Sequence, residues 1–264
     1  MTHSRREAIR MGAAALAGAG VASALAAIAQ ETTMVEGDRV TTGAGDLIVQ
    51  PVNHASLVLG LGDIVIYADP VGDPTLYAGL PAPTLILVTH EHGDHFNVAT
   101  LAAIFDTETR LVANPRVFDM LPAELQARAA ALANGQSATE AGVPIEAIPA
   151  YNNSPDRLQY HPQGRDNGYI LSLGDRRIYI AGDTEDTPEM RALTNIALAF
   201  LPMNLPYTMS VEQAASVVIE FAPGIVYPYH YRGSDYGGFQ GAGRGRRRGN
   251  RGSAPRLVSG LRLP

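Results

Sequence analysis

The sequence predicts one α/β domain, and three observations carry this prediction. Short apolar runs rich in β-branched residues, such as 85–88, suit strands that are buried on both faces. Other segments have apolar residues at helical spacing, of which 211–221 is the clearest. With 264 residues, 46% of them hydrophobic and 17% charged, the chain is long and apolar enough for one sizeable domain.

The first 29 residues are expected to be a signal peptide. Residues 4–10 contain the adjacent Arg5 and Arg6, and residues 11–29 form a run of small apolar residues. This arrangement resembles a twin-arginine export signal with a small-residue cleavage site before Gln30. The alternative is a membrane anchor, but the run is poor in Leu and Phe, so no stable membrane span is expected after cleavage. The mature protein is therefore expected to be periplasmic or secreted.

The domain itself is expected over residues 46–232, after a polar lead-in over residues 30–45. In its first half, apolar runs bounded by turn residues predict strands, and a Gly-Leu-Gly-Asp turn joins two of them as a hairpin. These strands are expected at residues 47–49, 55–59, 64–68, 85–88 and 110–113. Asn97 is expected to cap a helix over 98–105, and a second helix is expected over 123–133, before an Asn-Gly stop.

The second half carries the same signals for strands and helices. Strands are expected at residues 143–148, 170–173, 178–181, 196–201 and 224–230. A short helix is expected around 188–193, with Asp183, Glu185 or Thr187 as its N-cap. Ser210 is expected to cap the amphipathic helix over 211–221.

Composition changes abruptly after Arg232, and residues 233–264 are expected to form a disordered tail. Residues 237–252 form a Gly/Arg tract with almost no apolar content, which cannot bury enough surface to fold. A solvated tail, or a sequence altered from its ancestral reading frame, accounts for this composition. The alternative is contact with RNA or anionic lipid, although the tract has no interleaved aromatic residue beyond Phe239.

Composition and motifs also exclude some kinds of chemistry. The formal net charge is −6, which gives no electrostatic reason to expect nucleic-acid binding. The chain has no cysteine, so neither disulfides nor thiolate ligands can form. It contains no Gly-x-Ser-x-Gly elbow and no P-loop. Any metal must therefore be held by His, Asp, Glu and water.

A metal-binding motif directly follows the strand at 85–88. It holds His90, His92, Asp94 and His95 within six residues. In an extended segment alternate side chains share a face, so the first three can converge while His95 serves a second centre. Imidazole and carboxylate are ligands that zinc prefers, and α/β sheets place ligands at strand ends. The alternative is a polar strand-to-helix loop, but three histidines with an interleaved aspartate favour metal binding.

The motif His90-x-His92-x-Asp94-His95 resembles the signature of the metallo-β-lactamase-fold superfamily. The likeness extends from about residue 50 to residue 231. It implies a four-layer αβ/βα sandwich and a hydrolytic centre that usually holds two divalent metals. Zinc is the first choice and manganese the alternative, since the ligands are nitrogen and oxygen only.

The resemblance implies a first metal site that contains His90, His92 and a third histidine. Many members carry this third ligand near residues 150–155, where the present chain has asparagines. The next histidine along the chain is His161, which we expect to be the ligand. The alternative is a histidine on a surface loop, in which case the first site would be incomplete.

The resemblance also implies a second site formed by Asp94, His95 and His230. Asp183 lies in a Gly-Asp-Thr sequence that matches the superfamily motif whose aspartate bridges two metals. One carboxylate between two cations offsets their repulsion and can hold them roughly 3.5–4 Å apart. The alternative role for Asp183 is that of a helix N-cap.

Four further residues have expected roles around these sites. The opening hairpin, with His54 and a terminal Asp69, resembles the lactonase-like branch of the superfamily, which includes ascorbate-6-phosphate lactonase. His54 could approach the metals, although a core histidine is slightly favoured, and Asp69 is expected to orient a ligand histidine. Asn204 and Tyr207 could donate hydrogen bonds to a developing oxyanion, with loop packing as the alternative.

These expectations combine into a metal-dependent hydrolase that attacks an ester, lactone or phosphodiester with metal-bound hydroxide. The residues expected to act in catalysis are Asp94, Asp183, Tyr207 and Asn204. The expected partner is a small-molecule substrate, and nothing in the sequence indicates an oligomeric state. The alternatives are a periplasmic metal-binding or interaction protein without turnover and an RNA-processing nuclease, which the acidic body and the export signal disfavour.

Overall fold

The computed structural model describes residues 37–234, 239 and 256–257. The chain divides into two units, Met1–Glu31 and Thr32–Pro264, and the described residues all belong to the second. The expected signal peptide lies outside the described residues. Among the described helices, none has the length and apolar character needed to cross a membrane.

Among the described residues, the first sheet contains seven strands in the order β1 to β7, so neighbours in the sequence are also neighbours in space. The pairs from β1 to β4 are antiparallel, and those from β4 to β7 are parallel. The strands are β1 (Asp38–Thr42), β2 (Gly45–Asn53), β3 (Ser56–Leu61), β4 (Ile64–Ala68), β5 (Leu85–Val88), β6 (Arg110–Ala113) and β7 (Ala129–Ala131).

The second sheet, as far as the structure describes it, also has seven strands, and its spatial order is β14 to β8. The pairs from β8 to β11 are antiparallel, and those from β11 to β14 are parallel. The strands are β8 (Ser137–Glu140), β9 (Val143–Ala150), β10 (Asp166–Leu173), β11 (Arg176–Ile180), β12 (Ile196–Pro202), β13 (Ile225–Tyr229) and β14 (Arg256–Leu257).

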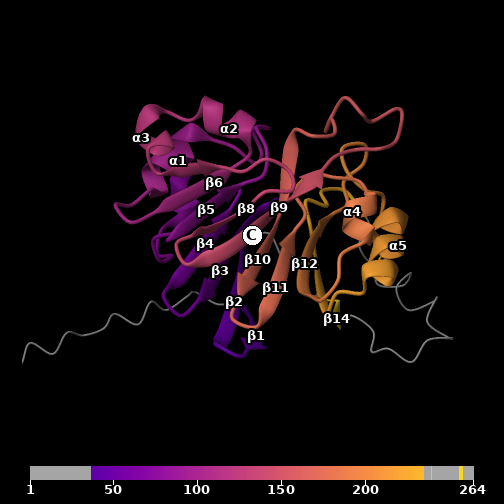
Figure 1. Ribbon diagram of the computed structural model, residues 1–264, viewed down its shortest axis with the longest axis horizontal. Helices are drawn as coiled ribbons and strands as arrows, with labels where there is room; N and C mark the ends of the chain where they lie inside the picture. Colours follow the sequence, from indigo (N-terminus) through magenta and orange to yellow (C-terminus); the bar gives the residue numbers. More distant parts are fainter. Residues whose placement is uncertain (1–36, 235–238, 240–255, 258–264) are drawn as a thin grey trace, which may run out of the picture. The chain divides into compact units, whose positions relative to one another are not determined.

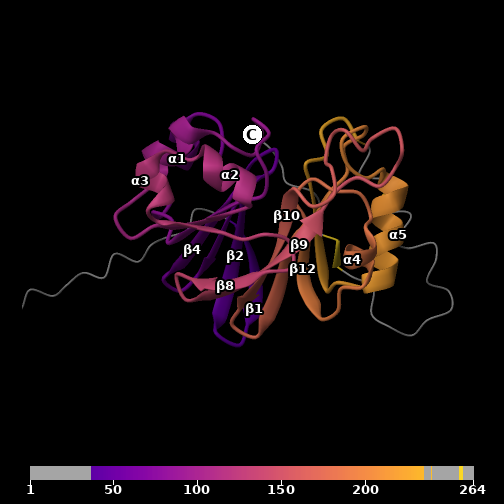
Figure 2. The same cartoon turned by 45° about the horizontal axis from the view of Figure 1, so that its top comes forward.

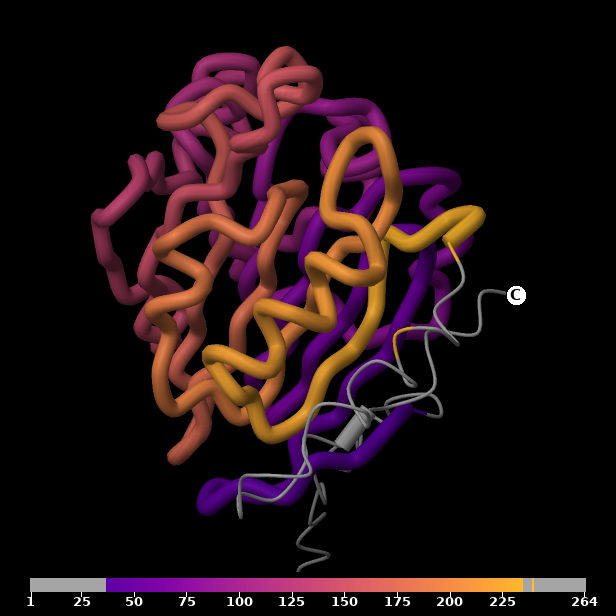
Figure 3. Tube along the Cα trace, turned by 90° about the vertical axis from the view of Figure 1, so that its right-hand side faces the viewer, coloured from indigo at the N-terminus to yellow at the C-terminus, as the bar shows by residue number. Residues whose placement is uncertain are grey.

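The two sheets face each other, and helices cover their outer faces (Figures 1 and 2). The helices α1 (Val98–Ile104), α2 (Pro115–Met120) and α3 (Ala123–Gln126) lie on the first sheet, together with the 3₁₀ helix η1 (Pro74–Tyr77). The helices α4 (Pro188–Arg191) and α5 (Val211–Phe221) lie on the second sheet, and Figure 3 shows α5 across its outer face.

The central core is built from the inner faces of both sheets. It joins residues of the first sheet, such as Leu57 and Leu87, to residues of the second, such as Leu171 and Phe200, all of which are buried. Burial of apolar surface from two sheets explains why the strands contain such long apolar runs. The predicted four-layer αβ/βα sandwich is therefore confirmed.

Side-chain caps fix the starts of several helices. Asn97 accepts a hydrogen bond from the backbone N–H of Thr100, and Ser210 accepts one from that of Gln213. Gln213 in turn accepts from the Ser210 N–H, which completes a capping box. Both caps had been predicted. Thr187 caps α4, which leaves the Asp183 carboxylate free for another role.

Several predicted boundaries were wrong. The helix expected over 123–133 ends at Gln126, and Ala129–Ala131 form β7 beside β6. Alanine favours a helix locally, but the hydrogen bonds offered by the edge of the sheet override that preference. Part of the expected polar lead-in forms β1, which pairs along β2.

The tail expected to be disordered contributes to the fold at two described points. Arg256–Leu257 form β14, which pairs in parallel with β13. The side chain of Phe239 is buried in the apolar cluster beneath α5. Phe239 lies near the start of the Gly/Arg tract, and Arg256–Leu257 follow the tract. These two parts of the tail therefore supply a core side chain and a strand.

Candidate metal centre

Most of the predicted site residues follow strands that end at one edge of the sandwich. His90, His92, Asp94 and His95 follow β5, whereas Asp183 follows β11 and His230 follows β13. His161 precedes β10, and His54 lies in the turn between β2 and β3. The six histidines of the described chain therefore come from distant segments, since His54 and His230 are 176 residues apart in sequence. This convergence at strand ends is the usual location of a site in an α/β fold.

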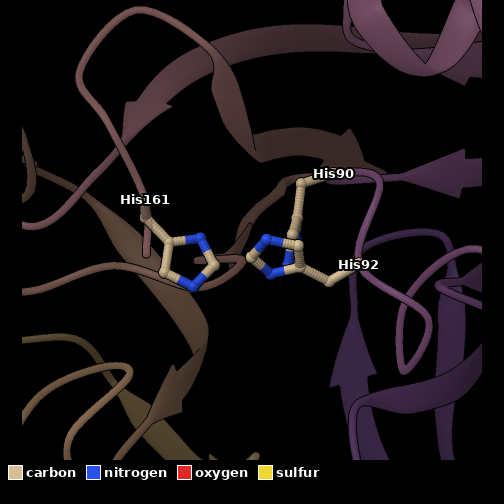
Figure 4. A group of neighbouring side chains, drawn as sticks. All are labelled: His90, His92 and His161. Carbon is tan, nitrogen blue, oxygen red and sulfur yellow. The ribbon is translucent and has the colours of Figure 1, made fainter. Parts of the chain in front are cut away.

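The first group contains His90, His92 and His161. One ring nitrogen of each lies within 4.8 Å of the corresponding nitrogens of the other two. Figure 4 shows the rings facing one another, with His90 and His92 on the side of the first sheet and His161 on the side of the second. His90 and His161 are almost completely buried. The structure therefore brings together the three histidines predicted for the first site.

The Asp183 carboxylate lies between this group and the remaining histidines. Its Oδ2 atom is 3.9 Å from His90 Nε2, 3.5 Å from His161 Nε2 and 3.2 Å from His230 Nε2. Its Oδ1 atom is 3.4 Å from His95 Nε2. Gly182 allows this position because its φ is +66° and a Cβ atom would lie 2.7 Å from the Asn167 carbonyl oxygen.

A further group contains Asp94, His230 and His54. His230 Nε2 is 3.3 Å from Asp94 Oδ2, and His54 Nε2 is 3.8 Å from the same oxygen. The rings of His54 and His230 are 4.0 Å apart between centroids. His95 instead groups with His90 and Asp183, although its ring also stacks near that of His230 at 5.1 Å.

This arrangement differs from the sequence prediction at two histidines. His95, expected with Asp94 and His230, groups with His90 and Asp183. His54 had been slightly favoured as a core histidine, but its imidazole takes a place beside Asp94 and His230. The sequence carries a weak signal for this position, since His54 sits in a hairpin turn rather than inside an apolar strand. The pairing of that turn with the end of β13, where the His230 N–H donates to the His54 carbonyl oxygen at 3.0 Å, is visible only in the fold.

Hydrogen bonds that involve the Nδ1 atom orient three of the imidazoles. His95 Nδ1 donates to Asp69 Oδ2 at 2.7 Å, as expected for Asp69, and His161 Nδ1 donates to Asp166 Oδ2 at 2.9 Å. The Thr89 hydroxyl donates to Asp69 at 2.7 Å and lies 3.0 Å from His90 Nδ1. Each Nε2 atom is thereby turned toward Asp183, as in metal sites where a carboxylate orients the ligand histidine.

The surroundings lower the pKa of several groups of the centre and raise that of His95. Burial lowers the pKa of His95, but the carboxylates of Asp183 and Asp69 outweigh this effect and hold it well above its usual value. Burial lowers the pKa of His90 far below its usual value, and neighbouring His95 lowers it further. Burial raises the pKa of Asp183, but positive charge on His230 and His95 outweighs this effect and holds it well below the usual range. The hydrogen bond with His230 does the same for Asp94. Burial, His230 and Arg232 lower the pKa of His54 to about 4.

The centre has the chemistry that a divalent cation requires. Among the described residues, the buried atoms His90 Nε2, His95 Nε2 and Asp183 Oδ1 have no hydrogen-bond partner. A buried polar atom without a partner costs roughly 1–3 kcal/mol, and coordination of a cation would remove that cost. Nitrogen and carboxylate donors without thiolate suit zinc or manganese. The residues therefore fit a metal.

The structure does not join Asn204 and Tyr207 to this centre. Within residues 37–234, neither side chain forms a hydrogen bond or ion pair with the histidines or with Asp183. The Tyr207 side chain is exposed and its ring lies edge-on to that of Tyr160 at 5.0 Å. Both residues belong to the loop after β12, which begins beside the centre because the Met203 N–H donates to the His230 carbonyl oxygen.

Comparisons with known proteins agree with this geometry. Residues 64–231 match the beta-lactamase superfamily domain. A UPF0173 metal-dependent hydrolase of Thermus thermophilus is 30% identical over 197 residues, which cover 69% of this chain and 83% of the relative.

Solved structures of related proteins have a similar fold. A proposed metal-dependent hydrolase from Parabacteroides distasonis is 39% identical, with a TM-score of 0.77 over 87% of this chain and 99% of that one. Igni18, a metallo hydrolase from Ignicoccus hospitalis, is 24% identical, with a TM-score of 0.57 over 70% of this chain and 82% of that one, which supports the fold alone. This chain therefore belongs to the metallo-β-lactamase superfamily, in a family of metal-dependent hydrolases.

Proposed function

We propose that this chain is a binuclear hydrolase in which two divalent cations share Asp183. The ligands of the first cation would be His90, His92 and His161, and those of the second Asp94, His95 and His230. The observation that carries the proposal is the position of the Asp183 carboxylate. Its oxygens lie 3.2–3.9 Å from four imidazole nitrogens that come from both sheets, and a bridging carboxylate needs such a position.

The proposed reaction is hydrolysis of an ester, lactone or phosphodiester bond in a small-molecule substrate. Zinc, or manganese as the alternative, would supply Lewis acidity and lower the pKa of water toward neutrality. The chain's own part is to orient the imidazoles through Asp69, Thr89 and Asp166 and to exclude bulk water around the buried ligands. The Asp94 side chain is 51% exposed, so substrate would enter from its side.

Asn204 and Tyr207 are proposed as contacts for the substrate rather than for the metals. β12 runs parallel to β11 and β13, so the loop that follows it starts at the same edge as Asp183 and His230. Export by the twin-arginine route, which we propose from the amino-terminal sequence, would allow the metals to be loaded before export.

The proposal is tested by metal analysis combined with a substrate panel. Metal-replete wild-type protein should contain two equivalents of metal and hydrolyse a member of an ester, lactone and phosphodiester panel. The double variant His92→Ala, Asp183→Ala should lose both metal and turnover. Full activity of that variant in the presence of a chelator would refute the proposal, and tight metal binding without turnover would favour the metal-binding protein instead.

A further inference from the structure

His54 is the one described histidine at the centre that lacks an assigned role. Its side chain is 5% exposed, yet its imidazole forms no hydrogen bond within residues 37–234. Its nearest ionic neighbour is the Asp94 carboxylate, at 3.8 Å from Nε2. A core histidine would normally direct its ring nitrogens to hydrogen-bond partners, so packing alone does not account for this orientation.

Distances around His54 match those between ligands of one metal ion. Zinc binds imidazole nitrogen at about 2.0–2.1 Å and carboxylate oxygen at about 2.0–2.2 Å, so two ligands at a tetrahedral angle lie roughly 3.4 Å apart. His230 Nε2 lies 3.3 Å from Asp94 Oδ2, and His54 Nε2 lies 3.8 Å from it. One donor atom from each of these three residues lies within 4.8 Å of the other two.

The backbone fixes His54 in this place. The His230 N–H donates to the His54 carbonyl oxygen at 3.0 Å, and the His54 N–H donates to Asn53 Oδ1 at 2.8 Å. His230 has a φ of +44°, an unusual value for a residue other than glycine. The turn between β2 and β3 and the end of β13 are therefore tied together, and strain at such a position commonly accompanies function.

We propose that His54 is a metal ligand and that, with Asp94 and His230, it completes the second cation site. This inference rests on the proposed function only in requiring a cation at the centre. The proposed site would bind a divalent cation that accepts nitrogen and oxygen donors, such as zinc or manganese. Because Asp94 is 51% exposed while His90 and His161 are 0–1% exposed, this cation should exchange more readily than the buried one.

The test compares His54→Ala and His54→Gln with the wild-type protein. Glutamine retains a hydrogen-bond donor for Asp94 but is a poor ligand for zinc, so it separates ligation from the positioning of Asp94. Both variants should bind the first equivalent of Zn²⁺ as the wild-type protein does. The dissociation constant of the second equivalent should rise at least about tenfold in both, since even loss of a partner outside the coordination sphere typically costs that much.

Isothermal titration calorimetry of metal-free protein with Zn²⁺ gives the dissociation constants, and elemental analysis after dialysis gives the metal content. Thermal unfolding of the metal-free variants checks that they fold. His92→Ala serves as the matched control, because it should weaken the other equivalent. Wild-type affinity for the second ion in His54→Ala, or full recovery of that affinity in His54→Gln, would overturn the assignment. Failure of the wild-type protein to bind any zinc would instead overturn the proposed function.

Discussion

Residues that contact the imidazoles of the centre decide how these rings are oriented. Asp69 accepts hydrogen bonds from the Thr89 backbone N–H, the Thr89 hydroxyl and His95 Nδ1, at 2.7–2.8 Å. It is completely buried and has a φ of +45°. A buried carboxylate in this strained conformation needs all three donors, because a buried charge without partners is costly. Asp69 thus connects His95 and, through Thr89, His90.

Replacement of Asp69 should weaken metal binding without removing a ligand. Asp69→Asn keeps the size of the side chain and tolerates a positive φ, but it lacks the charge that holds the Nδ1 proton of His95. We expect metal affinity to fall roughly 10–100-fold, measured by competition with a chromogenic chelator. Asp73→Asn, at the exposed N-cap of η1, is the control. An affinity of Asp69→Asn equal to that of the control would show that Asp69 does not orient His95.

At the scale of elements, the loop between β9 and β10 carries His161, which lies later in the chain than the resemblance implied for the third histidine. Glu185, which is fully buried, holds this loop: it accepts from the N–H groups of Asn153 and Ser154 at 2.7 and 2.6 Å. Arg157 pairs with the same carboxylate at 2.5 Å and donates to the Thr208 carbonyl oxygen at 2.9 Å. Asn152 and Asn153, where the resemblance implied a third histidine, thus belong to a braced loop that carries His161 farther along the chain.

Removal of the Glu185 charge should loosen this loop. In Glu185→Gln, Arg157 loses its closest ionic partner and two N–H groups lose a charged acceptor, so hydrogen exchange over residues 151–161 should accelerate at neutral pH. Glu146→Gln, which removes an exposed carboxylate paired with Arg177, is the control. Exchange in Glu185→Gln as slow as in this control would show that another contact holds the loop.

The contribution of Glu185 to the stability of this loop should decrease as the pH falls. Burial raises the pKa of Glu185, but hydrogen bonds from Ser154, Gln213 and Asn153 outweigh it and lower the pKa below its ordinary value of 4.5. A carboxyl group whose pKa is lower in the folded than in the unfolded state stabilises the fold at pH values above its pKa in the unfolded state. This stabilisation is lost as the pH falls through the pKa of the folded state. The difference in exchange between wild type and Glu185→Gln should therefore narrow below about pH 4.5.

At the scale of the whole molecule, local sequence patterns predicted most of the strands. They also predicted that the site residues lie at the ends of strands. Apolar runs such as 85–88 and the motif from His90 to His95 are local features, and they carried the prediction. The position of His54 and the strand β7 depend instead on pairing between segments distant in sequence. Such pairing is set by tertiary contacts that override local propensity. The sequence therefore offered a place at the metals only as one alternative for His54, and it did not predict β7.

The centre joins the two sheets of the sandwich at one edge. His90, His92, Asp94 and His95 belong to the half of the chain that forms the first sheet, whereas His161, Asp183 and His230 belong to the half that forms the second. Cations held between them would link the sheets, and a cation that binds only the folded state stabilises it by mass action. At a free metal concentration 100 times the dissociation constant, the gain is about 2.7 kcal/mol.

Metal removal should therefore lower the thermal stability of the whole domain. For a domain of about 200 residues, a change of 1 kcal/mol shifts Tm by roughly 2–4 °C, so chelation should lower Tm by roughly 5–10 °C. Differential scanning calorimetry with and without a chelator measures this shift. The His92→Ala, Asp183→Ala variant is the matched control and should show no response, because its Tm should already lack the metal contribution. Equal Tm values for wild-type protein with and without metal would mean that no cation bridges the sheets.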